Sequence, residues 1–132
     1  GLMKRLQEAG YTVMLETNGS ISLEGVEKGV VKIVDFKCPS SGMTAHMDFS
    51  NTGYLGKQDE VKFVIGDKDD FRWACEVVGR YRLIGRCTVL FSPVYPSLEA
   101  RELARWILKE KLQVRLQLQL HRIIWPEAER GV

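Results

Sequence analysis

The sequence contains no long run of charge of either sign and no long apolar run. Its 19 basic and 17 acidic residues are interspersed and leave a net charge of +2, which gives no reason to expect nucleic acid or a membrane surface as a partner. No apolar stretch approaches the roughly 18 residues of a membrane span, and no signal peptide opens the chain. The expected location is therefore the cytoplasm.

Cysteine and histidine are scarce. Cys38, Cys75 and Cys87 lie far apart, and no two of them have the short spacing of a zinc ribbon or a redox pair. Cys75 and Cys87 fall at apolar positions and are expected to be buried, reduced thiols, whereas Cys38 lies in a loop. The chain offers no serine–histidine–aspartate order, phosphate-binding loop or metal-ligand spacing, so the residues alone indicate no specific chemistry.

What the chain does have is enough apolar sequence for a core. It is 132 residues long and 45% hydrophobic, which suits one domain or a piece of a larger one. Leu2, Leu6 and Ala9 already have helical spacing, so we expect the chain to begin inside a helix. On this interpretation residues 1–132 are the C-terminal part of a single domain in a longer protein.

Strand-like and helix-like segments alternate along the chain. The helices are expected before Gly10, after Asp67 as N-cap and after Ser97 as N-cap. Short connections between such segments imply parallel strands and an α/β fold, because each helix crosses over to the next strand. Five strands make the larger part of a (β/α) barrel without closing it. The strands are expected at 12–17, 30–34, 60–65, 87–91 and 114–121.

The last of these strands alternates strictly between apolar and polar residues. Val114 and every second residue to Leu120 form one face, and Arg115 and every second residue to His121 form the other. The upstream strands are apolar nearly throughout, as in a sheet covered on both faces. The polar face has two readings. Either this is an edge strand turned to water, or Gln119 and His121 line a pocket.

Polar residues follow the predicted strands at their carboxyl ends, where parallel α/β sheets bind ligands. Caps and turns alone would place some of them there. The pair Asp35 and Lys37 is either a surface pair or a holder for the amino and carboxylate groups of one zwitterionic ligand. Gly19 either belongs to a turn or lets a ligand approach closely, and His121 is either structural or a pocket residue. The groups at these ends are Thr17, Asn18, Gly19, Asp35, Lys37, Gly66, Asp67, Ser92, Pro93 and His121.

Four stretches together resemble the 7-carboxy-7-deazaguanine synthases, a radical S-adenosylmethionine family. They are Glu-Thr-Asn-Gly-Ser at 16–20, Asp-Phe-Lys-Cys-Pro-Ser-Ser-Gly-Met at 35–43, Asp-Glu-Val-Lys-Phe-Val-Ile at 59–65 and Leu-Gln-Leu-His-Arg-Ile-Ile-Trp-Pro at 118–126. The resemblance covers nearly the whole chain in the same order. The first stretch is weak alone, whereas the second and last together are specific.

The resemblance implies a partial (β/α) barrel of the radical S-adenosylmethionine type with a [4Fe-4S] cluster, S-adenosylmethionine and Mg²⁺. In the family, a 5′-deoxyadenosyl radical starts the ring contraction of 6-carboxy-5,6,7,8-tetrahydropterin to 7-carboxy-7-deazaguanine with loss of ammonia, in queuosine and deazapurine biosynthesis. It further implies a carbon–nitrogen lyase, a homodimer and a reductant such as flavodoxin. The protein then orients and shields the reactants, because the cofactor carries the difficult chemistry.

Matched position by position, the resemblance assigns roles to single residues. Thr17 matches a substrate contact, and Gly19 matches a backbone contact to S-adenosylmethionine. Asp35 and Lys37 occupy the segment that holds the same cofactor, where many relatives have Ser-Pro-Lys. Ser92 matches the loop against the adenosine. Gln119 and His121 match the final strand, where the histidine reaches the pterin. In some relatives the chain ends at the proline that matches Pro126, whereas here 127–132 follow.

The cluster motif C-x3-C-x2-C, its magnesium-binding threonine and a Gly-Gly-Glu motif do not occur in the sequence, and the three cysteines have the wrong spacing to replace them. We therefore expect this chain, made alone, to bind no cluster and to be inactive. Two alternatives are a glycyl-radical-enzyme activase, which has similar strand ends without the 38–43 and 118–121 motifs, and a non-enzymatic nucleoside-binding half-barrel.

Overall fold

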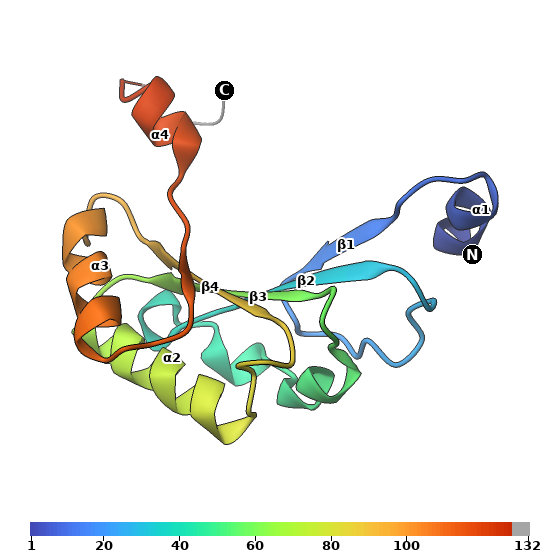
Figure 1. Ribbon diagram of the computed structural model, residues 1–132, viewed down its shortest axis with the longest axis horizontal. Coiled ribbons are helices and arrows are strands. Elements are labelled where there is room, and N and C mark those ends of the chain that lie inside the picture. Colours follow the sequence, from blue (N-terminus) through green and yellow to red (C-terminus); the bar gives the residue numbers. More distant parts are fainter. Residues whose placement is uncertain (128–132) are drawn as a thin grey trace.

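The centre of the computed structural model, which describes residues 1–127, is one sheet of five parallel strands (Figure 1). Their order is β1-β2-β3-β4-β5, so every strand pairs with its neighbours in sequence. The outer strands β1 and β5 do not pair with each other, and the sheet stays open. The predicted α/β fold with an incomplete barrel is thus confirmed. The strands are β1 (Met14–Thr17), β2 (Val31–Phe36), β3 (Glu60–Ile65), β4 (Thr88–Pro93) and β5 (Arg115–Leu116).

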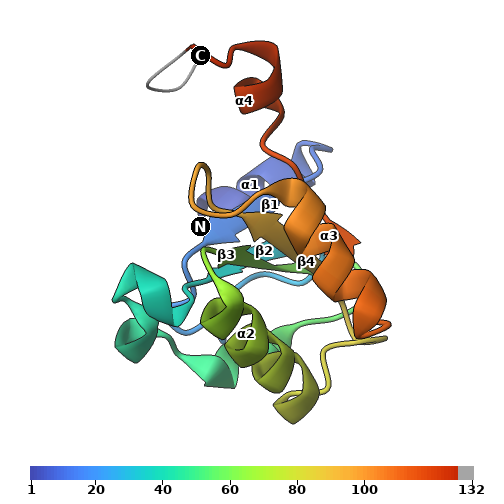
Figure 2. The ribbon, with the colours of Figure 1, turned by 90° about the vertical axis from the view of Figure 1, so that its left-hand side faces the viewer.

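The helices α2 and α3 lie against one face of this sheet, and α1 lies beyond the amino end of β1 (Figure 1 and Figure 2). None of the helices in residues 1–127 is long and apolar enough to cross a membrane. The helices are α1 (Leu2–Glu8), η1 (Pro39–Ser41), η2 (Thr44–His46), η3 (Phe49–Tyr54), α2 (Lys68–Arg80), α3 (Ala100–Lys109) and α4 (Leu120–Ile124), with η for 3-10 helices.

The apolar core lies on the face of the sheet that α2 and α3 cover. The register aligns three valines across β2, β3 and β4 and, two residues further along, three phenylalanines. All of them are at most 2% exposed, and the central ring packs against both of its neighbours with centroids 5.8 and 5.6 Å away. These residues are Val34, Val61, Val89, Phe36, Phe63 and Phe91.

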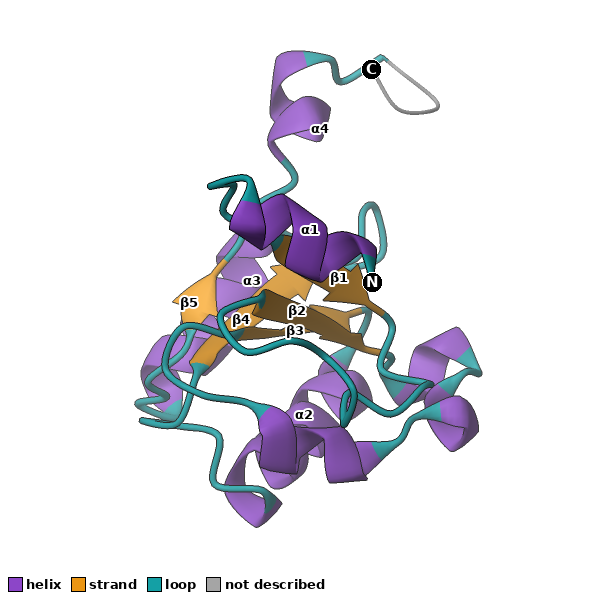
Figure 3. Cartoon of the chain, turned by 90° about the vertical axis from the view of Figure 1, so that its right-hand side faces the viewer, coloured by secondary structure: helices purple, strands orange, loops and turns teal. Residues whose placement is uncertain are grey.

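The opposite face, called the open face below, carries the alternate residues of the same strands. Asp35 pairs in register with Lys62, Lys62 with Leu90, and Leu90 with Arg115. Figure 3 shows the sheet between α2 on one side and the segment with α4 on the other. The strands are therefore apolar toward the helices, and on the open face they mix charged residues with apolar ones such as Leu90. They are less uniformly apolar than the strands of a sheet covered on both sides.

The helix α2 begins as predicted. The carboxylate of Asp67 accepts a hydrogen bond from the backbone N–H of Asp70 at 2.8 Å, which satisfies a donor that the first helical turn leaves free. Phe71, Ala74 and Val78 are buried against the sheet. The predicted cap is confirmed.

The helix α3 begins later than predicted. Its N-cap is Glu99, and Ser97 instead donates its hydroxyl to the carbonyl of Val94 at 3.1 Å. The predicted cap at Ser97 is wrong because this serine closes the turn that follows β4, and the helix begins two residues later than predicted. Leu103 and Ile107 of this helix are buried.

The predicted strand at 114–121 is wrong in its second half. Only Arg115–Leu116 forms a strand, and Leu120–Ile124 forms α4. The backbone N–H of Gln117 still donates to the carbonyl of Phe91 at 2.9 Å. The next donor from β4 would be Pro93, which has no N–H, so the ladder ends there.

Candidate functional site

Polar groups gather at the carboxyl edge of the sheet, where the parallel strands end together. Thr17 closes β1, Lys37 follows β2, Asp67 follows β3, and Ser92 precedes the last residue of β4. The edge lies on the left in Figure 1. Parallel pairing therefore brings the predicted groups from four strands to one side of the molecule, as the sequence led us to expect.

Asp35 and Lys37 form an ion pair at this edge. The Lys37 Nζ lies 2.6 Å from Asp35 Oδ2, and the two side chains are 33% and 20% exposed. Asp35 Oδ1 is buried and has no hydrogen-bond partner among the described residues. A buried carboxylate oxygen without a donor is costly, so this atom calls for an N–H or O–H from outside the described chain.

Ser92 supplies a second such atom. Its side chain is fully buried, and its Oγ has no hydrogen-bond partner among residues 1–127. Ser92 pairs in register with Val64, and Asp35 pairs with Lys62 two residues earlier on the same strand. Because alternate residues share a face, Ser92 and Asp35 both belong to the open face.

Thr17 and Gly19 lie in a turn that packs against the core. The Thr17 Oγ1 accepts a hydrogen bond from the Gly19 N–H at 3.2 Å. Gly19 has a φ of +72°, and a Cβ there would lie 3.0 Å from Val34 Cγ1 and 3.2 Å from Phe36 Cε1. The fold itself thus requires this glycine, since a side chain would collide with the core. Its predicted contact with the cofactor remains a prediction.

The structure does not bring Gln119 and His121 beside Thr17 and Lys37. Gln119 is the N-cap of α4, and His121 is exposed on that helix. In all three ribbon views α4 stands apart from β1 and β2. The shared pterin pocket of Thr17, Gln119 and His121 is therefore not assembled in residues 1–127, and the roles of these residues stay predictions. Of the extension after Pro126, residues 128–132 lie outside the described part.

The segment before α4 instead borders the loop that follows β4. It encloses a cavity of about 490 Å³ with that loop and the start of α3. The guanidinium of Arg122 lies 5.3 Å from the ring centre of Tyr95 across it. Gln119 thus lines a cavity next to the carboxyl end of β4, whereas His121 does not line it.

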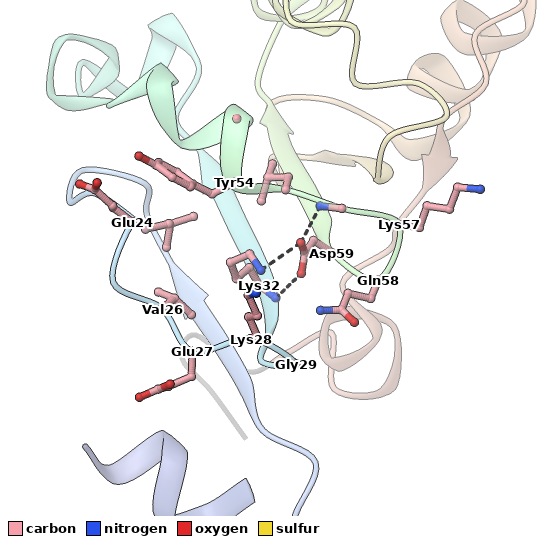
Figure 4. Close-up of a pocket in the computed structure, with 14 residues that line it drawn as sticks. Glu24, Val26, Glu27, Lys28, Gly29, Lys32, Tyr54, Lys57, Gln58 and Asp59 are labelled. Carbon is pink, nitrogen blue, oxygen red and sulfur yellow. Dashed lines mark hydrogen bonds and ion pairs between the residues drawn. The ribbon is translucent and has the colours of Figure 1, made fainter.

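A second cavity, of about 520 Å³, lies at the amino ends of the strands (Figure 4). Asp59 lines this cavity and connects the segments around it. Its carboxylate accepts hydrogen bonds from the N–H groups of Lys32 and Gly56 at 2.8 and 2.7 Å and lies 3.2 Å from Lys32 Nζ. Both carboxylate oxygens of Asp59 are thus bonded within the described residues, and Asp59 joins β2 to the segment before β3.

The three cysteines do not converge. Cys38 follows β2, Cys75 lies on α2, and Cys87 precedes β4, and all three are free thiols. In the described part of the chain, no group of three or more histidine, cysteine or acidic residues could hold a metal ion. These residues therefore do not fit an iron–sulfur cluster.

Thiol reactivity provides a test of this arrangement. Burial, and next the Asp59 carboxylate, raise the pKa of the Cys87 thiol to about 11. Burial, followed by the nearby Asp70 carboxylate, also raises the pKa of Cys38. Because the thiolate is the reactive form, we expect iodoacetamide at pH 8 to alkylate Cys87 roughly a hundredfold more slowly than an unperturbed thiol, and Cys38 to react slowly as well. Mass spectrometry with and without urea measures the rates. Equally fast alkylation in both would contradict the burial.

The fold and the carboxyl edge define a class of protein, the open parallel α/β proteins with polar groups at the strand ends. In this class ligands bind at that edge. No family model matches the chain. Curated proteins do match it, and all of those reported below have the same name.

The chain is similar over its whole length to 7-carboxy-7-deazaguanine synthases, which confirms the resemblance found in its motifs. It is 38% identical to the protein of that name from Chlorobaculum tepidum, over 100% of the chain and 61% of the relative. It is 38% identical to the one from Koribacter versatilis, over 98% and 63%, and 40% identical to the one from Leptospira interrogans, over 89% and 50%. The chain thus spans about half to three fifths of these relatives.

Proposed function

We propose that the chain is the C-terminal part of a 7-carboxy-7-deazaguanine synthase. The complete enzyme would convert 6-carboxy-5,6,7,8-tetrahydropterin to 7-carboxy-7-deazaguanine with loss of ammonia, as a radical S-adenosylmethionine carbon–nitrogen lyase. Support comes from the similarity along the whole chain to proteins of that name and from the open parallel sheet with polar strand ends. The cytoplasmic location predicted from the sequence belongs to this proposal.

The observation that carries the proposal is the pair of unsatisfied atoms on the open face. Asp35 Oδ1 and Ser92 Oγ are buried without partners among the described residues, and the cation of Lys37 lies beside Asp35. S-Adenosylmethionine fits such a set, because its ammonium can donate to Asp35 and its carboxylate can accept from Lys37. When bound to a cluster, this cofactor supplies the radical that starts the reaction. The chain's own residues would hold and orient it, with Gly19 contributing a backbone contact.

The remaining components would come from elsewhere. The described residues do not fit a [4Fe-4S] cluster, so we propose that its ligands and the Mg²⁺ site lie on an upstream part of the complete protein. The pterin, a second copy of the chain and a reductant such as flavodoxin are the proposed partners. Thr17, Gln119 and His121 are the proposed substrate contacts, which requires the α4 segment to lie closer to β1 in the complete enzyme.

The direct test is to express the complete gene, purify the protein without oxygen and incubate it with S-adenosylmethionine, a reductant and 6-carboxy-5,6,7,8-tetrahydropterin. We expect 7-carboxy-7-deazaguanine and 5′-deoxyadenosine, measured by chromatography and mass spectrometry. The chain of 132 residues alone should give neither. Nucleoside formation without the deazaguanine would assign the protein to another radical reaction.

His121 provides a test of the substrate site in the complete protein. We expect His121→Ala to lower deazaguanine formation about tenfold, the loss of roughly one hydrogen bond to a substrate, with a smaller effect on cleavage of S-adenosylmethionine. His46→Ala is the matched control, because His46 is also exposed and has no assigned role. Equal losses of both activities in His121→Ala would mean that this histidine is structural.

A further inference from the structure

A buried aspartate lies directly behind the carboxyl edge. Asp70 is 1% exposed and belongs to the first turn of α2. Its Oδ1 accepts a hydrogen bond from the Ser40 N–H at 2.9 Å. Its Oδ2 accepts one from the Ser40 hydroxyl at 2.5 Å and one from the Gly66 N–H at 2.8 Å. We call these residues the Ser40–Asp70–Gly66 cluster.

The cluster joins the segments that follow two neighbouring strands. Ser40 lies in η1 after β2, and Gly66 follows β3 directly. The fit leaves little room, because a Cβ on Gly66 would lie 3.0 Å from Ser40 Oγ and 3.2 Å from Asp70 Oδ2. The buried Asp70 carboxylate accepts three hydrogen bonds and is therefore held in one position. It thereby fixes the distance between the segments that follow β2 and β3.

Lys37 lies three residues before Ser40 on this anchored segment. The connection between them is bonded as well, since Ser41 Oγ donates to the carbonyl of Cys38 at 2.7 Å and Thr44 Oγ1 donates to the carbonyl of Lys37 at 3.0 Å. Cys38 itself is buried, which leaves this stretch little freedom. The position of the Lys37 backbone therefore depends on a carboxylate that does not belong to the open face.

We infer that Asp70 is a positioning residue that sets the location of Lys37 for the carboxylate of a bound S-adenosylmethionine. This inference rests on the proposed function. Asp70 would not touch the ligand. It would act through Ser40 and the segment from 37 to 40, because a ligand-binding cation is effective only when its support holds it close to the correct place.

Asp59 provides a matched control at the opposite edge of the same sheet. It is equally buried at 1%, and its carboxylate likewise accepts from two backbone N–H groups and interacts with a side chain, that of Lys32. It directly precedes β3 at the amino ends of the strands, whereas Lys37 follows the carboxyl end of β2. If the loss of a buried carboxylate acted only through stability, replacing Asp70 and replacing Asp59 should have the same effect.

The experiment compares Asp70→Asn, Ser40→Ala and Asp59→Asn in the complete, cluster-containing protein. Calorimetric titration with S-adenosylmethionine gives the affinity, and thermal unfolding gives the stability. We expect the Kd to rise about tenfold in Asp70→Asn and Ser40→Ala and to stay unchanged in Asp59→Asn, although all three unfold at lower temperature. The KM for the pterin should stay constant in all of them.

An equal change of Kd in Asp70→Asn and Asp59→Asn, or no change in Asp70→Asn, would overturn the inference while the wild type still binds. If Asp70→Asn does not fold, Ser40→Ala, which removes only one hydroxyl, takes its place. An unchanged Kd in Ser40→Ala would then overturn the inference. Failure of the wild-type protein to bind S-adenosylmethionine would overturn the proposed function and this inference with it.

Discussion

Replacing Lys37 by methionine in the complete protein should raise the Kd for S-adenosylmethionine about tenfold to a hundredfold. A hydrogen bond to a charged group contributes about 1.5–3 kcal/mol, and each 1.4 kcal/mol is a factor of about ten in affinity. Methionine keeps most of the length of the side chain but removes its charge. It also leaves the half-buried Asp35 carboxylate without the Nζ that now lies 2.6 Å from Oδ2.

Calorimetric titration of both proteins with S-adenosylmethionine measures this change. Lys57→Met is the matched control, because it makes the same substitution at an exposed lysine that lines the cavity at the amino ends of the strands (Figure 4). We expect its Kd to equal that of the wild type. An unchanged Kd in Lys37→Met would show that the ion pair is only a surface feature.

Phe63→Ala is expected to lower the free energy of unfolding by about 3–5 kcal/mol, as large-to-small changes at buried aromatic residues do. Phe63 is fully buried on the central strand of the sheet. Its ring centre lies 5.8 Å from that of Phe36, 5.6 Å from that of Phe91 and 6.1 Å from that of Trp73. Three aromatic neighbours cannot all move inward, so the substitution leaves a cavity.

Urea unfolding followed by circular dichroism measures this loss. The control is Leu108→Ala, since Leu108 is 76% exposed and should contribute less than about 0.5 kcal/mol. A loss in Phe63→Ala as small as that of the control would mean that the core rearranges around the missing ring. The same measurement on the chain of 132 residues shows whether it folds on its own.

The parallel sheet could be predicted because each of its strands carries its own local signal. The segment from 60 to 65 is mostly apolar and lies between turn residues, and the observed strand has those bounds. The Asp67 cap was predictable for the same reason, because aspartate directly before a helical apolar pattern is a preferred N-cap residue. Neighbouring strands then pair in order, since short crossovers permit few alternatives.

The end of the chain could not be predicted in this way. Alternation from Val114 to His121 is typical of a strand, but a strand also needs donors on its neighbour. Pro93 has no N–H to donate to β5. Whether this position faces β5 depends on the register between β4 and β5 and cannot be read from either segment alone. Leu118 and Leu120, assigned to the apolar face of the predicted strand, are 40% and 64% exposed.

The candidate site was predictable only in part. Asp35 and Lys37 are close in sequence and follow a strand, so their pairing was among the expected alternatives. The link between Ser40 and Asp70 spans 30 residues and leaves no periodic pattern. The unsatisfied Oγ of Ser92 could not be predicted either, because it depends on the side chains of several strands around it.

The two faces of the sheet should tolerate different substitutions, because one face is packed in the core and the other is not. Val34 and Phe36 on β2 are buried in the core, whereas Ile33 and Asp35, which precede them in turn, lie on the open face. A change of specificity can therefore accumulate at every second position while the hidden positions keep the scaffold intact. A library that varies only the alternate residues of β2 and β3 should retain far more folded members than one that varies consecutive residues.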